Sequence, residues 1–196
     1  MSSRLYLVRH GETEWNRQQR IQGSTDIPLN DTGRAQALAS AALLASVEPH
    51  AVFASPLLRA FETGEIIART LGLAVPVPVP KLVERHYGEA EGLNYRQIEK
   101  RFPDRSLVPG QEHKKQLSAR SMQALHAIAR SSDGESIVIV AHGGVIRAIM
   151  AELHPSGSHG PIANGSIHTL GFDSDLLSLV GFDRLVPPLT ARELCC

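Results

Sequence analysis

The chain has 196 residues, of which 42% are hydrophobic and 20% are charged, and its twenty basic side chains balance twenty acidic ones. This length fits one domain with a substantial core. The balanced charge gives no field that would draw the protein to nucleic acid or to an anionic membrane, and no apolar run approaches a membrane span. The two cysteines, Cys195 and Cys196, are adjacent and cannot form a disulfide that links distant parts of the chain. With a first strand that leaves no room for a signal peptide, these features suit a reducing, cytoplasmic setting.

The first half of the chain alternates predicted strands and helices. These elements are a strand at 4–8, a helix at 31–45, a strand at 51–54 and a helix at 56–72. The first strand is apolar almost throughout, which indicates burial on both faces of a parallel sheet. Ser55 and Pro56 predict the start of the second helix, as an N-cap residue and a proline in the first turn. Helical spacing predicts that the first helix buries Leu38, Ala41, Ala42 and Ala45, and the second Leu57, Phe61, Gly64, Ala68 and Leu71.

Alternating valine and proline at 75–80 predict an edge strand, because the prolines remove backbone donors from one side while the valines pair on the other. A polyproline segment is the alternative. A polar, irregular insertion is expected from about 93 to 116. After it come a helix at 117–130, a strand at 136–141, a helix at 145–153 and a hairpin of strands at 169–173 and 178–183. The helix at 117–130 is expected to bury Met122, Leu125, Ile128 and Ala129.

Three predicted strands lead into side chains that suit phosphate. The first ends at Arg9 and His10, the second feeds a helix whose first turn holds Arg59, and the third ends at His142 before a helix N-terminus. Parallel strands joined by right-handed crossovers bring these ends to one edge of an α/β sheet. Arginine forks and helix N-termini both favour a tetrahedral dianion. The residues therefore favour a phosphate site over histidines that only make hydrogen bonds at strand ends.

Glu84 follows the predicted edge strand and is a further candidate. A carboxyl group beside a phosphate pocket can be held protonated by the nearby negative charge, and so act as an acid. The alternative is a surface carboxylate paired with Arg85. Without the other residues, Glu84 would be interpreted as such a surface carboxylate.

Five sequence blocks then stand out together. They lie at 7–16, 22–37, 55–63, 84–88 and 141–144, and the first reads Leu-Val-Arg-His-Gly-Glu-Thr-Glu-Trp-Asn. In this order they resemble the motifs of the histidine phosphatase superfamily, the phosphoglycerate mutase-like proteins. The resemblance implies a three-layer α/β/α sandwich whose central sheet is mostly parallel with an antiparallel edge. The expected organisation is a single domain over 1–186, with a cap-like insertion at about 93–116 and a C-terminal tail at 187–196.

The resemblance also implies a phosphomonoesterase that needs neither a metal nor a cofactor, because cationic side chains neutralise the phosphoryl oxygens. His10 resembles the nucleophile that forms a phosphohistidine. Glu84 resembles the proton donor to the leaving oxygen and then the base that activates water. The other residues that resemble the catalytic pocket are Arg9, Arg59 and His142. The implied substrate-binding positions are Asn16, Gln22, Gly23, Tyr87 and Gly143.

Departures from the dedicated mutases of this family favour net hydrolysis. Tyr95 stands at the position of a mutase lysine, no Arg-Arg pair follows, and Gly144 stands where the mutases carry asparagine. In the other direction, residues 95–116 carry six basic and three acidic side chains, an excess that would attract a substrate with a second acidic group. Scattered surface charge is the alternative. Mutase activity and a non-catalytic phosphate-binding module therefore stay open.

The expected partner is a small phosphorylated molecule, with no nucleic acid and no membrane, and a homodimer stays open. The remaining histidines form no recognisable metal-ligand cluster and are expected to be surface or structural residues. They are His50, His86, His113, His126, His154, His159 and His168.

Overall fold

The computed structural model describes residues 2–104, 108–132, 134–155 and 161–184. Its strands are β1 (Ser3–Arg9), β2 (Ala51–Ala54), β3 (Val77–Pro78), β4 (Ser136–Ala141), β5 (Ile167–Asp173) and β6 (Leu176–Arg184). Its α-helices are α1 (Glu14–Arg17), α2 (Asp31–Leu44), α3 (Leu58–Thr70), α4 (Tyr95–Arg101), α5 (Lys114–Arg130) and α6 (Gly143–Leu153). Short 3-10 helices lie at η1 (Ala45–Val47), η2 (Pro80–Leu82) and η3 (Gly88–Ala90).

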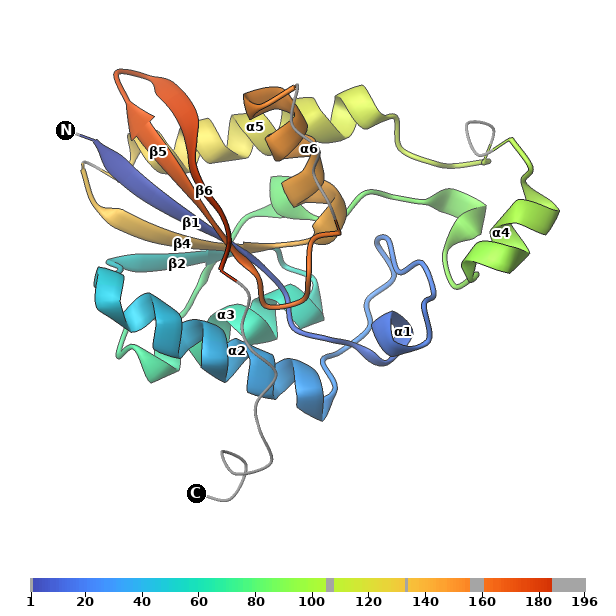
Figure 1. The fold of residues 1–196 in the computed structure, drawn as a ribbon, viewed down its shortest axis with the longest axis horizontal. Coiled ribbons are helices and arrows are strands. Elements are labelled where there is room, and N and C mark those ends of the chain that lie inside the picture. The colour runs from blue at the N-terminus through green and yellow to red at the C-terminus, as the bar shows by residue number, and fades with distance from the viewer. Residues whose placement is uncertain (1, 105–107, 133, 156–160, 185–196) are drawn as a thin grey trace.

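Within these ranges, six strands form one sheet in the order β3-β2-β4-β1-β5-β6. The strands β1, β2, β3 and β4 run parallel, whereas β5 and β6 form an antiparallel pair at one edge. Figure 1 shows α5 and α6 on one side of the sheet and α2 and α3 on the other. The predicted three-layer α/β/α sandwich with an antiparallel edge is therefore confirmed.

The central strand β1 contributes to both core layers, as its unbroken apolar run predicts. Leu5 and Leu7 are fully buried and pack with residues of α5 and α6, whereas Val8 packs with residues of α2 and α3. Full burial of each such side chain stabilises the fold by roughly 1.5–3 kcal/mol. The end of β1 that carries Arg9 and leads to His10 therefore extends directly from the hydrophobic core.

The buried face of α2 differs from the predicted one. Leu38 is 51% exposed, and Ala42 and Ala45 are exposed as well. The buried residues are instead Gly33, Ala37, Ser40, Ala41 and Leu44. Gly33 lies so close to the backbone of Glu12 that an added Cβ would stand 2.1 Å from its carbonyl oxygen. The face of α2 that carries the small residues is buried, because small residues allow a close approach of two backbones. The spacing of apolar residues alone does not predict this face.

The start of α3 was also predicted wrongly. The helix begins at Leu58 with Leu57 as an N-cap that offers no side-chain hydrogen bond, and Asp26 accepts a hydrogen bond from the Leu58 backbone N–H at 2.7 Å. The Ser55 hydroxyl is used instead by His142, at 2.7 Å. A contact across the sheet has therefore replaced the local cap. Of the predicted stripe, Gly64 and Ala68 are buried, while Phe61 and Leu71 are only partly so.

The insertion is more ordered than predicted. Residues 95–101 form α4, which begins with a capping box in which Asn94 accepts from the Gln97 backbone and Gln97 accepts from the Asn94 backbone. Beneath it lies a small separate core of Ala90, Ile98 and Val108. The signal for this helix was present in the sequence as an Asn-x-x-Gln capping box.

The other predicted elements agree with the structure apart from their ends. The edge strand is reduced to two residues of β3, next to β2. The helix α5 begins three positions earlier than predicted, at Lys114, and buries Leu125, Ile128 and Ala129, with Met122 partly buried. The strands β5 and β6 form the predicted hairpin. The predicted tail at 187–196 and His159 lie outside the described residues.

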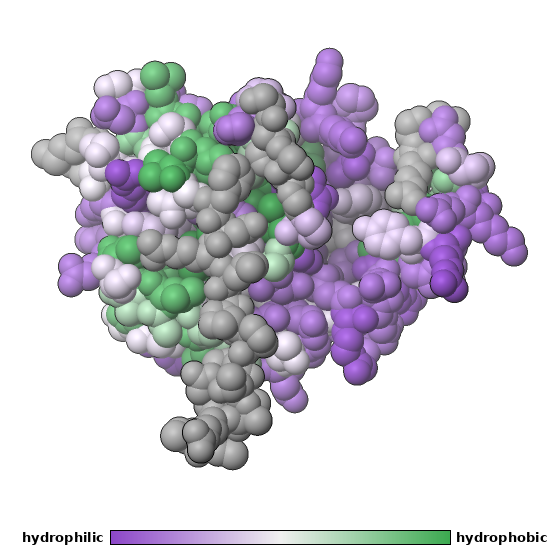
Figure 2. All heavy atoms as spheres, in the orientation of Figure 1, coloured by the Kyte–Doolittle hydropathy of each residue, from purple (hydrophilic) through white to green (hydrophobic). Residues whose placement is uncertain are grey.

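The visible face of the molecule is divided by polarity. Figure 2 shows hydrophilic side chains over α1 and α4 and hydrophobic patches over the β5–β6 hairpin and α2. Leu176 and Val180 of that hairpin are 73% and 52% exposed. None of the helices in the described part of the chain has the length and apolarity that a membrane crossing needs.

Candidate active site

The carboxyl ends of β1 and β4 and the start of α3 meet at one edge of the sheet. A cavity of about 340 Å³ opens there. Nine predicted site residues line it, namely Arg9, His10, Asn16, Gln22, Gly23, Arg59, Glu84, Tyr87 and Gly143. His142 does not line the cavity: it is fully buried, with its ring 5.2 Å from the ring of His10. The predicted residues are thus brought together, with His142 packed behind His10.

His10 is held as a neutral imidazole with a defined tautomer. Its Nδ1 lies 2.6 Å from the Gly11 carbonyl oxygen. Because a carbonyl oxygen can only accept, Nδ1 must carry the proton and Nε2 is left with a lone pair. Burial, followed by the charges of Arg59 and Arg9, lowers the pKa of His10 well below 6.5. The side chain is therefore an uncharged imidazole at neutral pH, and the lone pair on Nε2 can act as a nucleophile.

His142 is positioned by Ser55 at the end of β2. Its Nε2 lies 2.7 Å from the Ser55 hydroxyl, which also accepts from the Leu57 backbone N–H at 3.4 Å. When the hydroxyl donates its own proton to Nε2, the proton of His142 resides on Nδ1, a buried atom without a hydrogen-bond partner in the described structure. Burial, Arg59 and His10 lower the pKa of His142 well below 6.5. His142 is then a neutral imidazole next to His10.

Arg59, which is fully buried, and Arg9, which is partly buried, supply two positive charges. Arg59 donates from both Nη atoms, to the Thr25 carbonyl at 2.9 Å and the Gly23 carbonyl at 2.7 Å. Arg9 donates to the Ile162 carbonyl. In both residues Nε is buried and has no partner among the described residues. Burial lowers the pKa of Arg9 to about 10 and also lowers that of Arg59, so both stay charged at neutral pH and favour an anion in the cavity.

Asn16 and Gln22 add neutral polar groups to the wall. The Asn16 side-chain oxygen accepts from the Thr13 backbone at 3.2 Å and from the Asn164 amide at 3.2 Å. The amide nitrogen of Asn16 is thus the end left to donate toward the cavity. The side-chain oxygen of Gln22 is buried without a partner in the described structure. Both side chains can therefore contact a bound molecule.

Glu84 stands beside the helix that follows His142. One carboxylate oxygen accepts from the Gly144 backbone N–H at 2.9 Å and the other from the Arg85 backbone N–H at 2.8 Å. A Cβ at position 144 would lie 2.4 Å from Glu84, so glycine is needed for this approach. The Arg85 side chain donates to the Glu112 carbonyl instead. The alternative of a surface ion pair between Glu84 and Arg85 is therefore wrong.

Glu91 was not predicted from the sequence, and its side chain holds the loop around Gly23. Its carboxylate accepts from the backbone N–H groups of Ser24 and Thr25, each at 3.0 Å, and of Tyr87 at 2.9 Å. Although burial opposes the charge, hydrogen bonds from Thr25, Tyr87 and Ser24 lower the pKa of Glu91. Since Arg59 bonds the same loop, Glu91 helps to place a cavity arginine without lining the cavity.

Three more supporting residues were missed. Asn164 donates to the His10 carbonyl at 3.0 Å. Thr63 accepts from the Gly11 backbone N–H at 3.1 Å and joins the end of β1 to α3. Arg147 lines the cavity from α6. Of these three residues, only Arg147 could have been predicted from the sequence. It lies one helical turn beyond Gly143 and so on the same face of a predicted helix.

Acid should destabilise the folded chain through His10 and His142. Below pH 6.5 the unfolded chain gains protons that these buried imidazoles do not, so the contribution to stability, fully present above 6.5, is lost progressively toward their lower folded pKa values. Each adds a slope of up to about 1.4 kcal/mol per pH unit. Urea unfolding across this range measures the slope, which should become shallower in His10→Asn. An identical slope in the variant contradicts the buried neutral state.

Within the described ranges, no group of three His, Cys, Asp or Glu side chains could hold a metal ion. His168 is buried beside Ser166, at 3.1 Å, and His126 packs edge-on against Phe172, so these two histidines are structural as predicted. His50, His86, His113 and His154 are exposed.

Residues 5–183 match the model of the histidine phosphatase superfamily (branch 1), and the chain belongs to this superfamily. The chain is 39% identical over 178 residues to a metal-independent phosphoserine phosphatase of Arabidopsis thaliana, covering 85% of this chain and 75% of that protein. It is 36% identical over 163 residues to a 2,3-bisphosphoglycerate-dependent phosphoglycerate mutase 2 of Gloeobacter violaceus, covering 76% and 74%. The structure of a mycobacterial glucosyl-3-phosphoglycerate phosphatase with VO3 aligns with a TM-score of 0.82 at 31% identity, covering 92% and 98%.

Proposed function

We propose that this protein is a phosphoric monoester hydrolase that acts on a small phosphorylated metabolite through a phosphohistidine at His10. The observation that carries the proposal is the neutral His10 imidazole, with Nε2 unprotonated, in a cavity lined by the guanidiniums of Arg9 and Arg59. A nucleophile of this kind must be uncharged, and it needs nearby cations to neutralise the phosphoryl oxygens; the neutral imidazole and the two arginines support both. Relatives named as phosphatases support the same class.

The proposed reaction has two displacement steps. In the first, Nε2 of His10 attacks phosphorus, the bond from phosphorus to the ester oxygen breaks, and a proton carried by Glu84 passes to the leaving oxygen. In the second, Glu84 takes a proton from water, the water oxygen attacks phosphorus, and the electron pair of the P–N bond returns to Nε2. Arg9 and Arg59 stabilise the oxygens throughout, and His142 supports His10 from behind, so positioning and charge supply most of the rate.

Turnover should not depend on a divalent metal, because Arg9 and Arg59 neutralise the phosphoryl oxygens. Release of phosphate from para-nitrophenyl phosphate should change by less than about twofold after dialysis against EDTA, since no metal-bound water is needed as the nucleophile. A parallel panel of phosphorylated metabolites identifies the natural substrate. Loss of turnover on dialysis, restored by a divalent cation, would contradict metal independence.

Mutase activity is the second candidate, favoured by the 36% identity to a phosphoglycerate mutase. Hydrolysis is favoured by Tyr95, which lines the cavity where the dedicated mutases carry a lysine, and by Gly144. Incubation with 3-phosphoglycerate and a bisphosphoglycerate primer separates the two. Free phosphate as the main product supports the hydrolase, whereas rapid 2-phosphoglycerate formation without free phosphate supports the mutase.

We also propose a cytoplasmic location and a single domain over residues 1–186 with 93–116 as its cap-like segment. The adjacent cysteines, which cannot cross-link distant segments, suit a reducing compartment. The packing of Ile98 in α4 with Ala90 and Val108 supports the cap-like segment. A homodimer stays a prediction, and light scattering at defined concentrations decides between one and two copies.

A further inference from the structure

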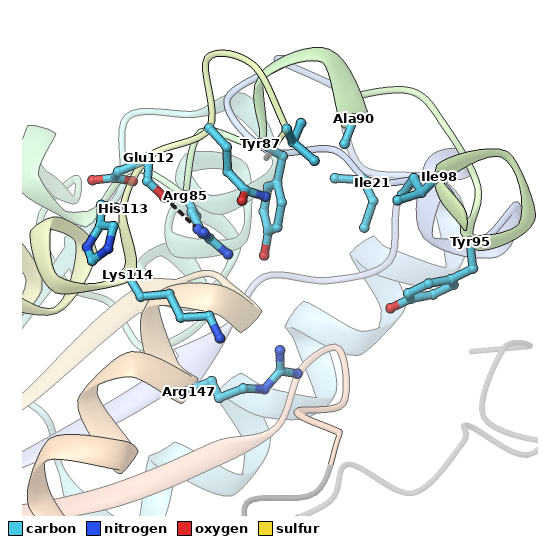
Figure 3. Close-up of a pocket in the computed structure, with 12 residues that line it drawn as sticks. Ile21, Arg85, Tyr87, Ala90, Tyr95, Ile98, Glu112, His113, Lys114 and Arg147 are labelled. Carbon is cyan, nitrogen blue, oxygen red and sulfur yellow. Dashed lines mark hydrogen bonds between the residues drawn. The ribbon is translucent and has the colours of Figure 1, made fainter. Parts of the chain in front are cut away.

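A second, larger cavity of about 590 Å³ adjoins the one that holds His10. Ile21, Tyr87, Tyr95 and Arg147 line both. Figure 3 shows the hydroxyl ends of the two tyrosines directed toward its open centre. A molecule whose phosphate sits beside His10 therefore has room to extend into this second cavity, which we call the outer cavity.

Two cations reach into the outer cavity from different helices. Lys114 is the first residue of α5, and Arg147 belongs to α6. Figure 3 shows both side chains ending on the same side of the opening. Within the described part of the chain, neither has a hydrogen bond or an ion pair to a carboxylate. The charge of Arg147 reaches the phosphate cavity, because it adds to burial in lowering the pKa of Arg9.

The carboxylate closest in sequence to Lys114 is already neutralised. Glu112 lines the same cavity, but both of its oxygens accept from Arg120, at 2.7 and 2.9 Å. Arg85, another residue of the wall, lies with its guanidinium carbon 5.2 Å from the centre of the Tyr87 ring. The outer cavity thus keeps an excess of positive charge that the protein itself does not balance.

Another part of the wall is apolar. Ile21, Ala90, Ile98 and Val108 line it, and the last three are at most 6% exposed. In Figure 3, Ile21 and Ile98 lie across the opening from Lys114 and Arg147. A wall of this kind suits a carbon body, while the cations suit an acidic group attached to it.

We propose that the substrate is a phosphomonoester whose leaving group carries a second anionic group, and that Lys114 and Arg147 bind this group. The second anion is a carboxylate or a second phosphate, and the carbon body that joins it to the ester oxygen lies against Ile21 and Ile98. This inference rests on the proposed function, since it assigns the phosphate to the cavity beside His10.

Binding of non-hydrolysable probes tests the proposal without turnover. The probes are ω-phosphonoalkanoic acids with two to five methylene groups, the matching neutral phosphonoalkanamides and the matching bisphosphonates. Calorimetry should give a Kd for the acid or the bisphosphonate at least about tenfold lower than for the amide at one or more chain lengths, the effect of one charge-assisted contact. Tighter binding of the bisphosphonate than of the acid identifies the second group as a phosphate, and the reverse identifies a carboxylate.

Variants assign this preference to the two cations. In Lys114→Gln/Arg147→Gln the preference for the charged probe over the amide should fall below about threefold, since both charged donors are gone. Lys115→Gln is the matched control, because it removes the same charge one position further along α5 from a residue that does not line the outer cavity. The control should keep the full preference.

Equal binding of charged and neutral probes at every length overturns the proposal, as does a preference that survives in the double variant or an absence of binding by all probes. Turnover of para-nitrophenyl phosphate is measured separately. Turnover without a preference rejects the second anion site and leaves the proposed function standing, whereas a preference without turnover rejects the proposed function.

Discussion

His10→Ala is expected to lower kcat by roughly four orders of magnitude or more, because it removes the group that forms the covalent intermediate. The neighbouring cations alone would only polarise the phosphoryl group for attack by water. Since His10 is 2% exposed and its Nδ1 bonds the Gly11 carbonyl, His10→Asn is made in parallel to keep a polar side chain in the site. Steady-state hydrolysis of para-nitrophenyl phosphate, with circular dichroism on each variant, measures the effect.

His50→Asn is the matched control for this loss. His50 is exposed and precedes β2, at the end of the sheet away from the cavity. Its replacement should change kcat by less than about twofold, as is usual for exposed positions away from a site. Substantial turnover in a folded His10→Ala protein would refute the covalent route.

Glu84→Gln should slow turnover by about 100-fold to 10,000-fold for alkyl phosphates, because these poor leaving groups need a proton as the ester bond breaks. The loss should be much smaller for para-nitrophenyl phosphate, whose leaving group is stable as an anion. The variant keeps the size of the side chain, and the amide oxygen still accepts one of the two backbone N–H groups, from Arg85 or Gly144. The measurement is kcat/KM for a series of esters plotted against the pKa of the leaving alcohol.

Glu65→Gln on the exposed side of α3 serves as the control for the charge change. In the wild type and in this control the plot should be shallow, and in Glu84→Gln it should steepen. A parallel displacement of the whole line, with no change of slope, would remove Glu84 from the role of acid and leave it a part of the binding wall.

The site residues at the strand ends can be predicted from the sequence because their positions depend on local patterns. An apolar run that ends at Arg9 and His10, a second that ends at His142, and the right-handed crossover rule together place these residues at one sheet edge. The structure agrees, since β1 and β4 pair in parallel with Arg9 opposite Ala141. This part of the site follows from periodicity and chirality, without knowledge of distant contacts.

The supporting contacts could not be predicted in this way, because they join segments far apart in the chain. Glu91 bonds a loop some 66 residues earlier in sequence, and the Ser55 hydroxyl bonds His142, 87 positions later. A serine before proline is a good local N-cap signal, and here a tertiary hydrogen bond overrides it. The buried face of α2 was predicted wrongly for a related reason. The close backbone approach of Gly33 to Glu12 sets the orientation of the helix, although this leaves Leu38 exposed.

The most direct measurement follows the phosphoryl group itself. Enzyme mixed with radiolabelled substrate is quenched in alkali within one turnover, because phosphohistidine survives alkali and is lost in acid, and the labelled peptide is then sequenced. We expect label on the peptide that contains His10, at close to one phosphoryl group per active site, and none in His10→Ala. Label on any other residue, or full turnover without a labelled protein, would contradict the phosphohistidine mechanism.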